Sequence, residues 1–164
     1  MESNKANLKQ ENIGVLLISH GSRLPESVTT INKLADMYRE YTDFKVGVAY
    51  MELREPNIPT ALDDLVKNTE IDTVIAVPIF LSHGMHTTRD IPKILGIAND
   101  NHEGVANQDS HKHKDHQGHN HGHHHNHEFE KVNFDGKIIY TEPLGADPLL
   151  VEIIKNRVDL ALKD

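Results

Sequence analysis

Two hydrophobic patterns alternate along the chain. Continuous apolar runs at residues 14–19 and 73–80 are typical of strands buried on both faces, and residues 45–51 and 137–141 are β-rich as well. Between and after these runs, apolar residues recur at the spacing of an amphipathic helix. The helices predicted from this spacing cover residues 25–41, 60–68, 89–95 and the segment from 148 onward.

This alternation of strands and helices predicts the fold class. Strand–helix units joined in series form a parallel sheet with right-handed crossovers. We therefore predict an α/β fold of three α/β/α layers, built on a parallel four-stranded sheet. Residues at the ends of the predicted helices agree with this fold. Pro25 is suited to the first turn of a helix, Gly96 to a helix C-terminus, and Asp147 with Pro148 to a capped helix start. One face of the last helix carries Leu150, Val151, Ile154, Val158 and Ala161.

One segment breaks the pattern. Residues 111–127 read "HKHKDHQGHNHGHHHNH" and hold most of the 13 histidines of the chain. The sequence predicts a polar tail at 1–12 and one domain at 13–164, with a disordered histidine-rich insert at about 99–133. Such a composition binds metal with little geometric selectivity, or is a neutral surface insertion. Because the insert connects a helix to a strand, we expect it on the amino-end side of the sheet.

Composition narrows the functional classes. The 164 residues include no cysteine, which excludes disulfides and thiolate metal sites and fits the cytoplasm. No apolar run reaches the ~18 residues of a membrane span. The formal charge of −8 at pH 7 argues against nucleic acid as a partner. No glycine-rich phosphate loop follows a strand, which argues against a nucleotide cofactor.

Polar residues gather where the predicted strands end. In open α/β sheets, ligands bind beyond the carboxyl ends of the strands. His20 and Gly21 follow the first strand, and a second histidine-containing loop follows the third. A lone histidine at such a place often only bonds the backbone, but two histidines with acids between them favour a metal site. The remaining candidates in these loops are Glu52, Arg54, Glu55, Leu81, Ser82, His83, Gly84, Met85 and His86.

Glycines and arginines near the same edge add to this picture. Gly21 and Gly84 would let the backbone turn sharply and come close to a ligand. Arg23, Arg54 and Arg89 would suit an anionic ligand that carries several carboxylates.

Four stretches together resemble a known family. They read "LISHGSRLPES", "MELREPNIPTAL", "VPIFLSHGMHTTRDIP" and "YTEPLGADPLLVEII", and they occur in this order between residues 13 and 162. They resemble the small single-domain sirohydrochlorin chelatases of archaea. The resemblance implies the class II chelatase fold and a homodimer. It also implies ATP-independent insertion of Co²⁺ or Ni²⁺ into sirohydrochlorin with release of two protons, in cobalamin or nickel-tetrapyrrole biosynthesis, without a prosthetic group.

The resemblance also assigns roles to residues. It makes His20 both a metal ligand and the proton acceptor, and His86 the second metal ligand. Glu55 and the loop from Leu81 to His86 would contact the tetrapyrrole, with Glu52 and Arg54 as weaker candidates. His83 ranks below His86 as a ligand. A neutral imidazole can accept a pyrrole proton and bind a borderline metal ion, so these residue types suit the reaction.

Two other functions compete with this one. The chain could store or carry nickel or cobalt, with the histidine-rich tract as its binding segment and no role for His20 or His86. It could also be a ferrochelatase that acts on sirohydrochlorin. The sequence leaves the metal open among cobalt, nickel and iron.

Overall fold

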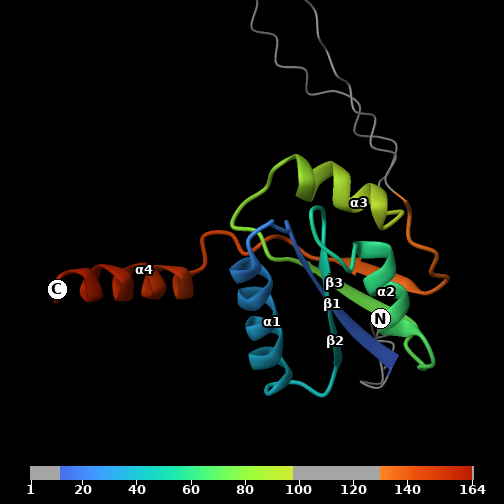
Figure 1. Ribbon diagram of the computed structural model, residues 1–164. Coiled ribbons are helices and arrows are strands. Elements are labelled where there is room, and N and C mark those ends of the chain that lie inside the picture. The colour runs from blue at the N-terminus through green and yellow to red at the C-terminus, as the bar shows by residue number, and fades with distance from the viewer. Residues whose placement is uncertain (1–11, 98–129, 164) are drawn as a thin grey trace, which may run out of the picture.

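A parallel sheet forms the centre of the molecule. The computed structural model describes residues 12–97 and 130–163. Within them, the four strands lie in the order β2-β1-β3-β4, and all neighbours pair in parallel (Figure 1). The predicted four-stranded parallel sheet is therefore confirmed. Its strands are β1 (Ile13–Ser19), β2 (Lys45–Tyr50), β3 (Thr73–Pro78) and β4 (Lys137–Tyr140).

Helices cover both faces of this sheet, as the three-layer prediction requires. Helix α1 (Pro25–Arg39) packs Ala35 on one face, against Val15 and Leu17 of β1. Helix α2 (Ile58–Val66) and helix α3 (Ile91–Ile94) pack on the other face, where the alternate β1 residues Leu16 and Ile18 are fully buried. Right-handed crossovers explain this division, since the chain moves toward one sheet edge through α1 and toward the other through α2 and α3.

The helix between β3 and the insert begins earlier than the sequence pattern predicts. Its first turn, η2 (His86–Asp90), is π-helical, and the Ile91 amide donates to the His86 carbonyl. Helix α3 then continues to Ile94. The apolar spacing alone did not reveal this turn because its residues are mostly polar.

The last helix, α4 (Pro148–Ala161), forms where predicted but packs differently. The Asp147 side chain caps it by accepting from the Leu149 amide, as expected. None of its residues is buried, and Figure 1 shows it extending away from the sheet. Its apolar face is therefore not covered by the part of the chain that the structure describes.

The predicted tail and insert fall mostly outside the described residues. For residues 1–11 and 98–129 the sequence-based expectation therefore stays a prediction. The described chain on either side of the insert is held together, because the Val132 amide donates to the Ile94 carbonyl at 2.9 Å. In the described ranges, no helix combines the length and apolar character that a membrane crossing requires.

Candidate metal centre

The pairing of β1 with β2 sets His20 beside Glu52. Main-chain hydrogen bonds continue this pairing past the strand ends, from the Met51 amide to the Ser19 carbonyl and from the Glu52 amide to the His20 carbonyl (3.1 Å). Gly21 allows the close approach: it has φ +92°, and a Cβ atom there would lie 1.9 Å from the Glu52 carbonyl oxygen. The expected need for glycine is thus confirmed at this position.

A turn after β3 presents His86. The side chain of Thr87 closes this turn by bonding both the amide and the carbonyl of Gly84, and it is buried. The Tyr140 hydroxyl donates to the Thr87 carbonyl at 2.9 Å and joins the turn to β4. His86 is therefore held at the carboxyl edge of the sheet, next to the end of β1.

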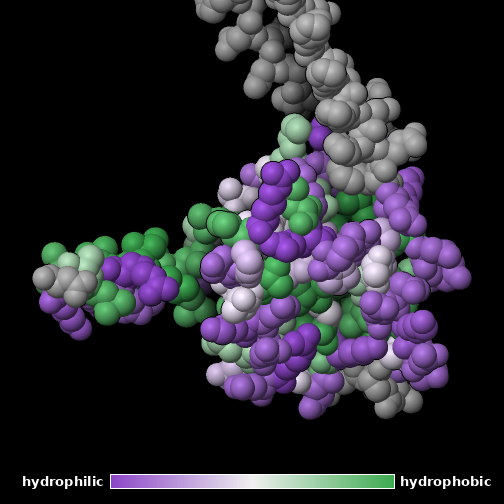
Figure 2. Space-filling view, viewed as in Figure 1, coloured by the Kyte–Doolittle hydropathy of each residue, from purple (hydrophilic) through white to green (hydrophobic). Residues whose placement is uncertain are grey.

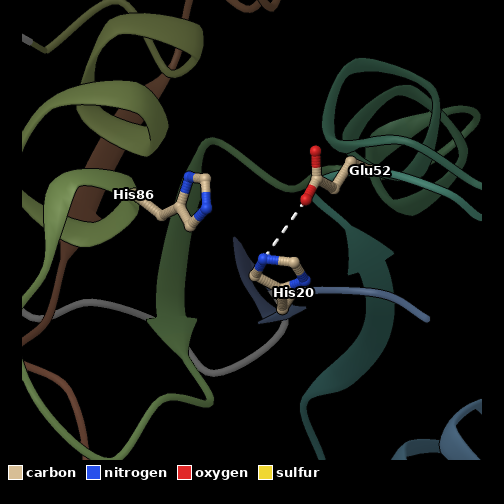
Figure 3. A group of neighbouring side chains, drawn as sticks. All are labelled: His20, Glu52 and His86. Carbon is tan, nitrogen blue, oxygen red and sulfur yellow. Dashed lines mark ion pairs between the residues drawn. The ribbon is translucent and has the colours of Figure 1, made fainter.

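His20, Glu52 and His86 converge at this edge (Figure 3). One ligand atom from each lies within 4.8 Å of the others, which is close enough for the three to share one metal ion. The two imidazole rings meet edge to face, with their centroids 4.9 Å apart. Three different strand ends thus supply two nitrogen donors and one carboxylate.

The ring nitrogens of His20 have distinct partners. Its Nδ1 lies 3.0 Å from the Gly21 carbonyl oxygen, an acceptor, so Nδ1 carries the hydrogen. The Nε2 lone pair then faces the Glu52 carboxylate, 3.2 Å away. A lone pair and a carboxylate oxygen at this distance repel each other unless a cation lies between them. The arrangement therefore suits a metal ion or a proton.

His86 is oriented by a buried carboxylate. Its Nδ1 lies 2.9 Å from Oδ2 of Asp90, whose side chain is 5 % exposed and also accepts from Nε of Arg89. Burial by itself raises the pKa of the Asp90 carboxyl, but the hydrogen bonds and charges of Arg89 and His86 outweigh it, so the pKa lies below its ordinary value. Asp90 stays ionised, holds the hydrogen on Nδ1, and leaves Nε2 of His86 free for a metal.

The centre is open to a large ligand. The side chains of His20, Glu52 and His86 are 46 %, 47 % and 36 % exposed, so the donor atoms are accessible. A groove of about 530 Å³ adjoins them, lined by Met51, Glu52, Leu53, Arg54, Glu55 and Asn57.

Two candidate substrate residues from this groove bond to the protein's own backbone. The Glu55 carboxylate accepts from the Asn57 amide at 2.7 Å, which supports the start of α2. The Arg54 guanidinium donates to the carbonyls of Ser22 and Arg23 and ties the two ligand loops together. The observed contacts of both residues are structural, and their contact with a substrate stays a prediction.

The loop after β3 is exposed beside the centre. Leu81 and Met85 are 66 % and 63 % exposed, which is a large exposure for apolar side chains, and Ser82 is exposed too. His83 points elsewhere: its Nε2 lies 2.6 Å from Oε2 of Glu142, and it is not in the three-residue group. At Gly84 the backbone does not need glycine, because its φ is not positive and a Cβ would meet open space, while the expected close approach to a ligand stays a prediction.

Asp90 is a functional residue that the sequence pattern did not indicate. It follows His86 by four residues, the spacing at which side chains meet on one helical face. Applying that spacing to each candidate ligand could have found it. The predicted helix began only at Arg89, however, so His86 and Asp90 did not fall on the same element.

Comparisons with known proteins place the chain among relatives of one family. A family model described as CbiX matches residues 14–161. The chain is 45 % identical to the sirohydrochlorin cobaltochelatase of Methanothermobacter thermautotrophicus, over 99 % of this chain and 100 % of that one. It is 42 % identical to the sirohydrochlorin cobaltochelatase of Methanopyrus kandleri, over 92 % and 97 %. A cobalamin biosynthesis CbiX protein from Marinobacter aquaeolei VT8 shares the fold, with a TM-score of 0.60 at 24 % identity over 92 % and 98 %.

Proposed function

The chain belongs to the CbiX family, and we propose that it is an ATP-independent sirohydrochlorin chelatase. In this reaction a divalent cobalt or nickel ion enters the macrocycle, and two pyrrole N–H protons leave. The observation that carries the proposal is the convergence of His20, Glu52 and His86 at an open strand edge. The names of the relatives favour cobalt, and nickel is the alternative metal substrate.

The donor set suits temporary binding of the metal. Imidazole nitrogen and carboxylate oxygen are good ligands for Co²⁺ and Ni²⁺, and three protein donors leave coordination positions open. The ion can then acquire macrocycle nitrogens on its exposed side while it is still held by the protein. Release follows because four ring nitrogens replace three independent side chains.

The same residues can accept the protons. When the metal moves into the macrocycle, Nε2 of His20 regains its lone pair and takes one pyrrole proton. We assign the second proton to the Glu52 carboxylate, 3.2 Å from that nitrogen. Both protons then pass to water, so charge and atoms balance: one dication enters the ring and two protons leave.

Neighbouring residues support these roles. Asp90 keeps His86 in the tautomer that binds metal through Nε2. The exposed apolar side chains of Leu81 and Met85 would lie against the macrocycle face. Glu55 and the rest of the Leu81–Met85 loop remain candidate contacts for its rim.

We further propose that the protein acts as a homodimer in the cytoplasm. Support for the dimer comes from α4, which exposes apolar side chains along its length and buries none of them against the described residues of its own domain. A 14-residue helix is marginally stable in water when it stands alone. A second copy is the simplest source of the missing contacts.

Visible absorbance tests the function directly. The protein is incubated with sirohydrochlorin and with Co²⁺, Ni²⁺ or Fe²⁺, each alone and in competition, and metal insertion is followed by the change in the macrocycle spectrum. We expect insertion far above the spontaneous rate. A protein that binds either metal tightly but leaves the spontaneous rate unchanged would be the storage or carrier protein. Insertion of Fe²⁺ in preference to both metals would make it the ferrochelatase.

A further inference from the structure

We propose that Leu53 is a substrate-binding residue, whose apolar side chain contacts the sirohydrochlorin macrocycle on the side away from Leu81 and Met85. The proposal rests on the chelatase function and adds to it a residue outside the three metal ligands. Leu53 is exposed beside the metal centre, has an unfavourable backbone conformation, and lies between two residues that are held in place.

Leu53 is exposed although its side chain is apolar. It is 52 % exposed, and it belongs to neither hydrophobic core cluster of the described residues. On the face of the molecule that Figure 2 shows, the surface of the domain body is mostly hydrophilic. Single exposed leucines occur in many proteins, so this exposure needs a second observation before it indicates a role.

The backbone of Leu53 provides the second observation, because it lies in the left-handed region with φ +64°. This conformation is unfavourable for a residue with a Cβ atom, and it is usually occupied by glycine or asparagine. Within the described ranges, the other non-glycine residue with a positive φ is Asn68, at +57°. Neither burial nor backbone preference therefore favours a leucine at position 53.

Contacts on both sides hold Leu53 in this conformation. The loop that contains it is closed at its ends, because the Tyr50 amide donates to the Pro56 carbonyl at 3.0 Å. Inside the loop, the Glu52 amide bonds to the main chain after β1, and the Arg54 guanidinium does so as well. Strained residues persist where their surroundings determine them in this way, and they concentrate at ligand-binding sites.

The place of Leu53 in the site indicates what its side chain can contact. The strand order β2-β1-β3 sets the loops after β2 and β3 on opposite sides of His20, and Figure 3 shows Glu52 and His86 on either side of it. Each of these two flanking ligands has an exposed apolar neighbour in the sequence, since Leu53 follows Glu52 and Met85 precedes His86. A ligand that reaches the metal centre therefore passes between apolar residues on two sides.

The chemistry of the macrocycle matches this arrangement. The tetrapyrrole ring is flat and conjugated, and its carboxylates lie on side arms at the rim. Metal insertion brings the ring nitrogens against the ion, so the ring itself must cover the residues around the centre. Leu53 lines the groove of about 530 Å³ together with Arg54 and Glu55. Bound substrate would remove the leucine side chain from water, which stabilises the complex.

The first experiment measures binding of metal-free sirohydrochlorin to the full chain by visible absorbance, with a chelator present so that no metal is inserted. Leu53→Ala and Leu53→Gly remove the apolar contact, and each should raise the Kd about 5- to 10-fold. Leu53→Met keeps an apolar side chain of similar volume and should stay within about twofold of the wild type. In metallation with Co²⁺, KM for sirohydrochlorin should follow the same order while KM for Co²⁺ stays unchanged.

The second experiment separates the side chain from the backbone by thermal unfolding, followed by circular dichroism. Alanine keeps the Cβ atom that disfavours a positive φ and glycine lacks it, so Leu53→Gly should melt about 2–4 °C above Leu53→Ala. The matched control is Asn68→Gly, which changes the other positive-φ residue, after α2 and before β3. This control lies on the amino-end side of the sheet and should bind sirohydrochlorin like the wild type.

The outcomes distinguish the contact from the function. Equal weakening of binding in Leu53→Ala and Leu53→Gly, despite different melting temperatures, supports a contact made by the side chain. Wild-type binding in both variants overturns the contact, and the chelatase function stands if the wild type inserts metal. Weak binding in Leu53→Ala that is restored in Leu53→Gly assigns the effect to the backbone and also overturns the contact. A wild type that neither binds nor metallates sirohydrochlorin overturns both proposals.

Discussion

Asp90 fixes the orientation of His86: Oδ2 of the buried carboxylate lies 2.9 Å from Nδ1 of the imidazole. Both residues lie in the π-helical turn, four positions apart, so their side chains meet on one side of it. One of the two imidazole donors of the metal centre is thereby held in a single tautomer before any metal arrives.

Substitution of Asp90 should therefore weaken metal binding more than tetrapyrrole binding. We expect Asp90→Ala to lower metal insertion roughly 10- to 100-fold, as is usual when the partner of a ligating histidine is removed. KM for the metal should rise while KM for sirohydrochlorin changes little. Asp90→Asn can still accept from Nδ1 and should recover part of the loss. Equal changes in both KM values would indicate a general structural defect instead.

The three histidines described in the structure should differ in importance. His20→Ala and His86→Ala each remove a donor from the centre and should nearly abolish insertion. His83→Ala should lose less of the insertion activity, because His83 pairs with Glu142 outside the centre. Initial rates by visible absorbance at saturating metal provide the comparison. Equal loss in all three variants would refute this ranking.

Substitutions of the two carboxylates of the β2–α2 loop, Glu52 and Glu55, should have different effects on metal insertion. Glu52→Gln removes a charged donor and a proton acceptor, so kcat should fall and KM for metal should rise. In Glu55→Gln the amide oxygen can still accept from the Asn57 amide, and the metal centre is untouched. We expect Glu55→Gln to retain KM for metal. If KM for metal rose more in Glu55→Gln than in Glu52→Gln, the roles assigned to the two carboxylates would be reversed.

Gly21 and Gly84 form a matched pair for a test of backbone geometry. Gly21→Ala places a Cβ against the Glu52 carbonyl at a positive φ, so it should destabilise the fold by more than about 2 kcal/mol and separate His20 from Glu52. Gly84→Ala meets open space, and its stability should match the wild type. Urea unfolding measures both. A Gly21→Ala protein as stable as the wild type would contradict the close approach.

Tyr140 should make stability fall at high pH. Burial, with a smaller contribution from the Glu142 charge, raises its pKa to about 12, whereas an unfolded tyrosine titrates near 10. The folded state favours the neutral phenol, so this contribution is complete below pH 10 and is lost as pH rises toward 12. Tyr140→Phe also removes the hydrogen bond to Thr87, at a cost of about 1 kcal/mol at pH 8.

Unfolding free energies at pH 8 and pH 11 check this prediction. The loss between the two pH values should be larger for the wild type than for Tyr140→Phe. Tyr41→Phe is the control, since that side chain is 84 % exposed. The same loss in all three proteins would show that Tyr140 does not titrate differently in the folded state.

The histidine-rich tract can be removed to ask whether it supplies metal. Residues 99–129 are replaced by a short linker, while Val132 is kept because its amide bonds to Ile94. The ends are held together, so shortening the connection should change stability by only a few kcal/mol. We expect unchanged insertion at saturating metal and slower insertion at limiting metal. Unchanged rates at limiting metal would end the supply hypothesis.

The strands, and the position of His20 and His86 at one edge of the sheet, could be predicted from the sequence. Strands buried on both faces appear as continuous apolar runs, and the carboxyl-end rule places His20 and His86 at one edge. Two features were not predicted. Asp90 lies in a π-helical turn that no apolar spacing marks, and only its position four residues after His86 could have indicated it. The packing of α4 depends on its surroundings, because an apolar helix surface shows that something covers it and not which chain does so.

The backbone contact between Gly21 and Glu52 has a consequence for redesign. Since main-chain bonds join the ends of β1 and β2, the separation of the backbones at positions 20 and 52 does not depend on which side chains they carry. Changing the side chains at positions 20, 52 and 86 would therefore alter the donor set and the metal preference on an unchanged backbone. The edge of this sheet is therefore a starting point for chelatases of other metal ions.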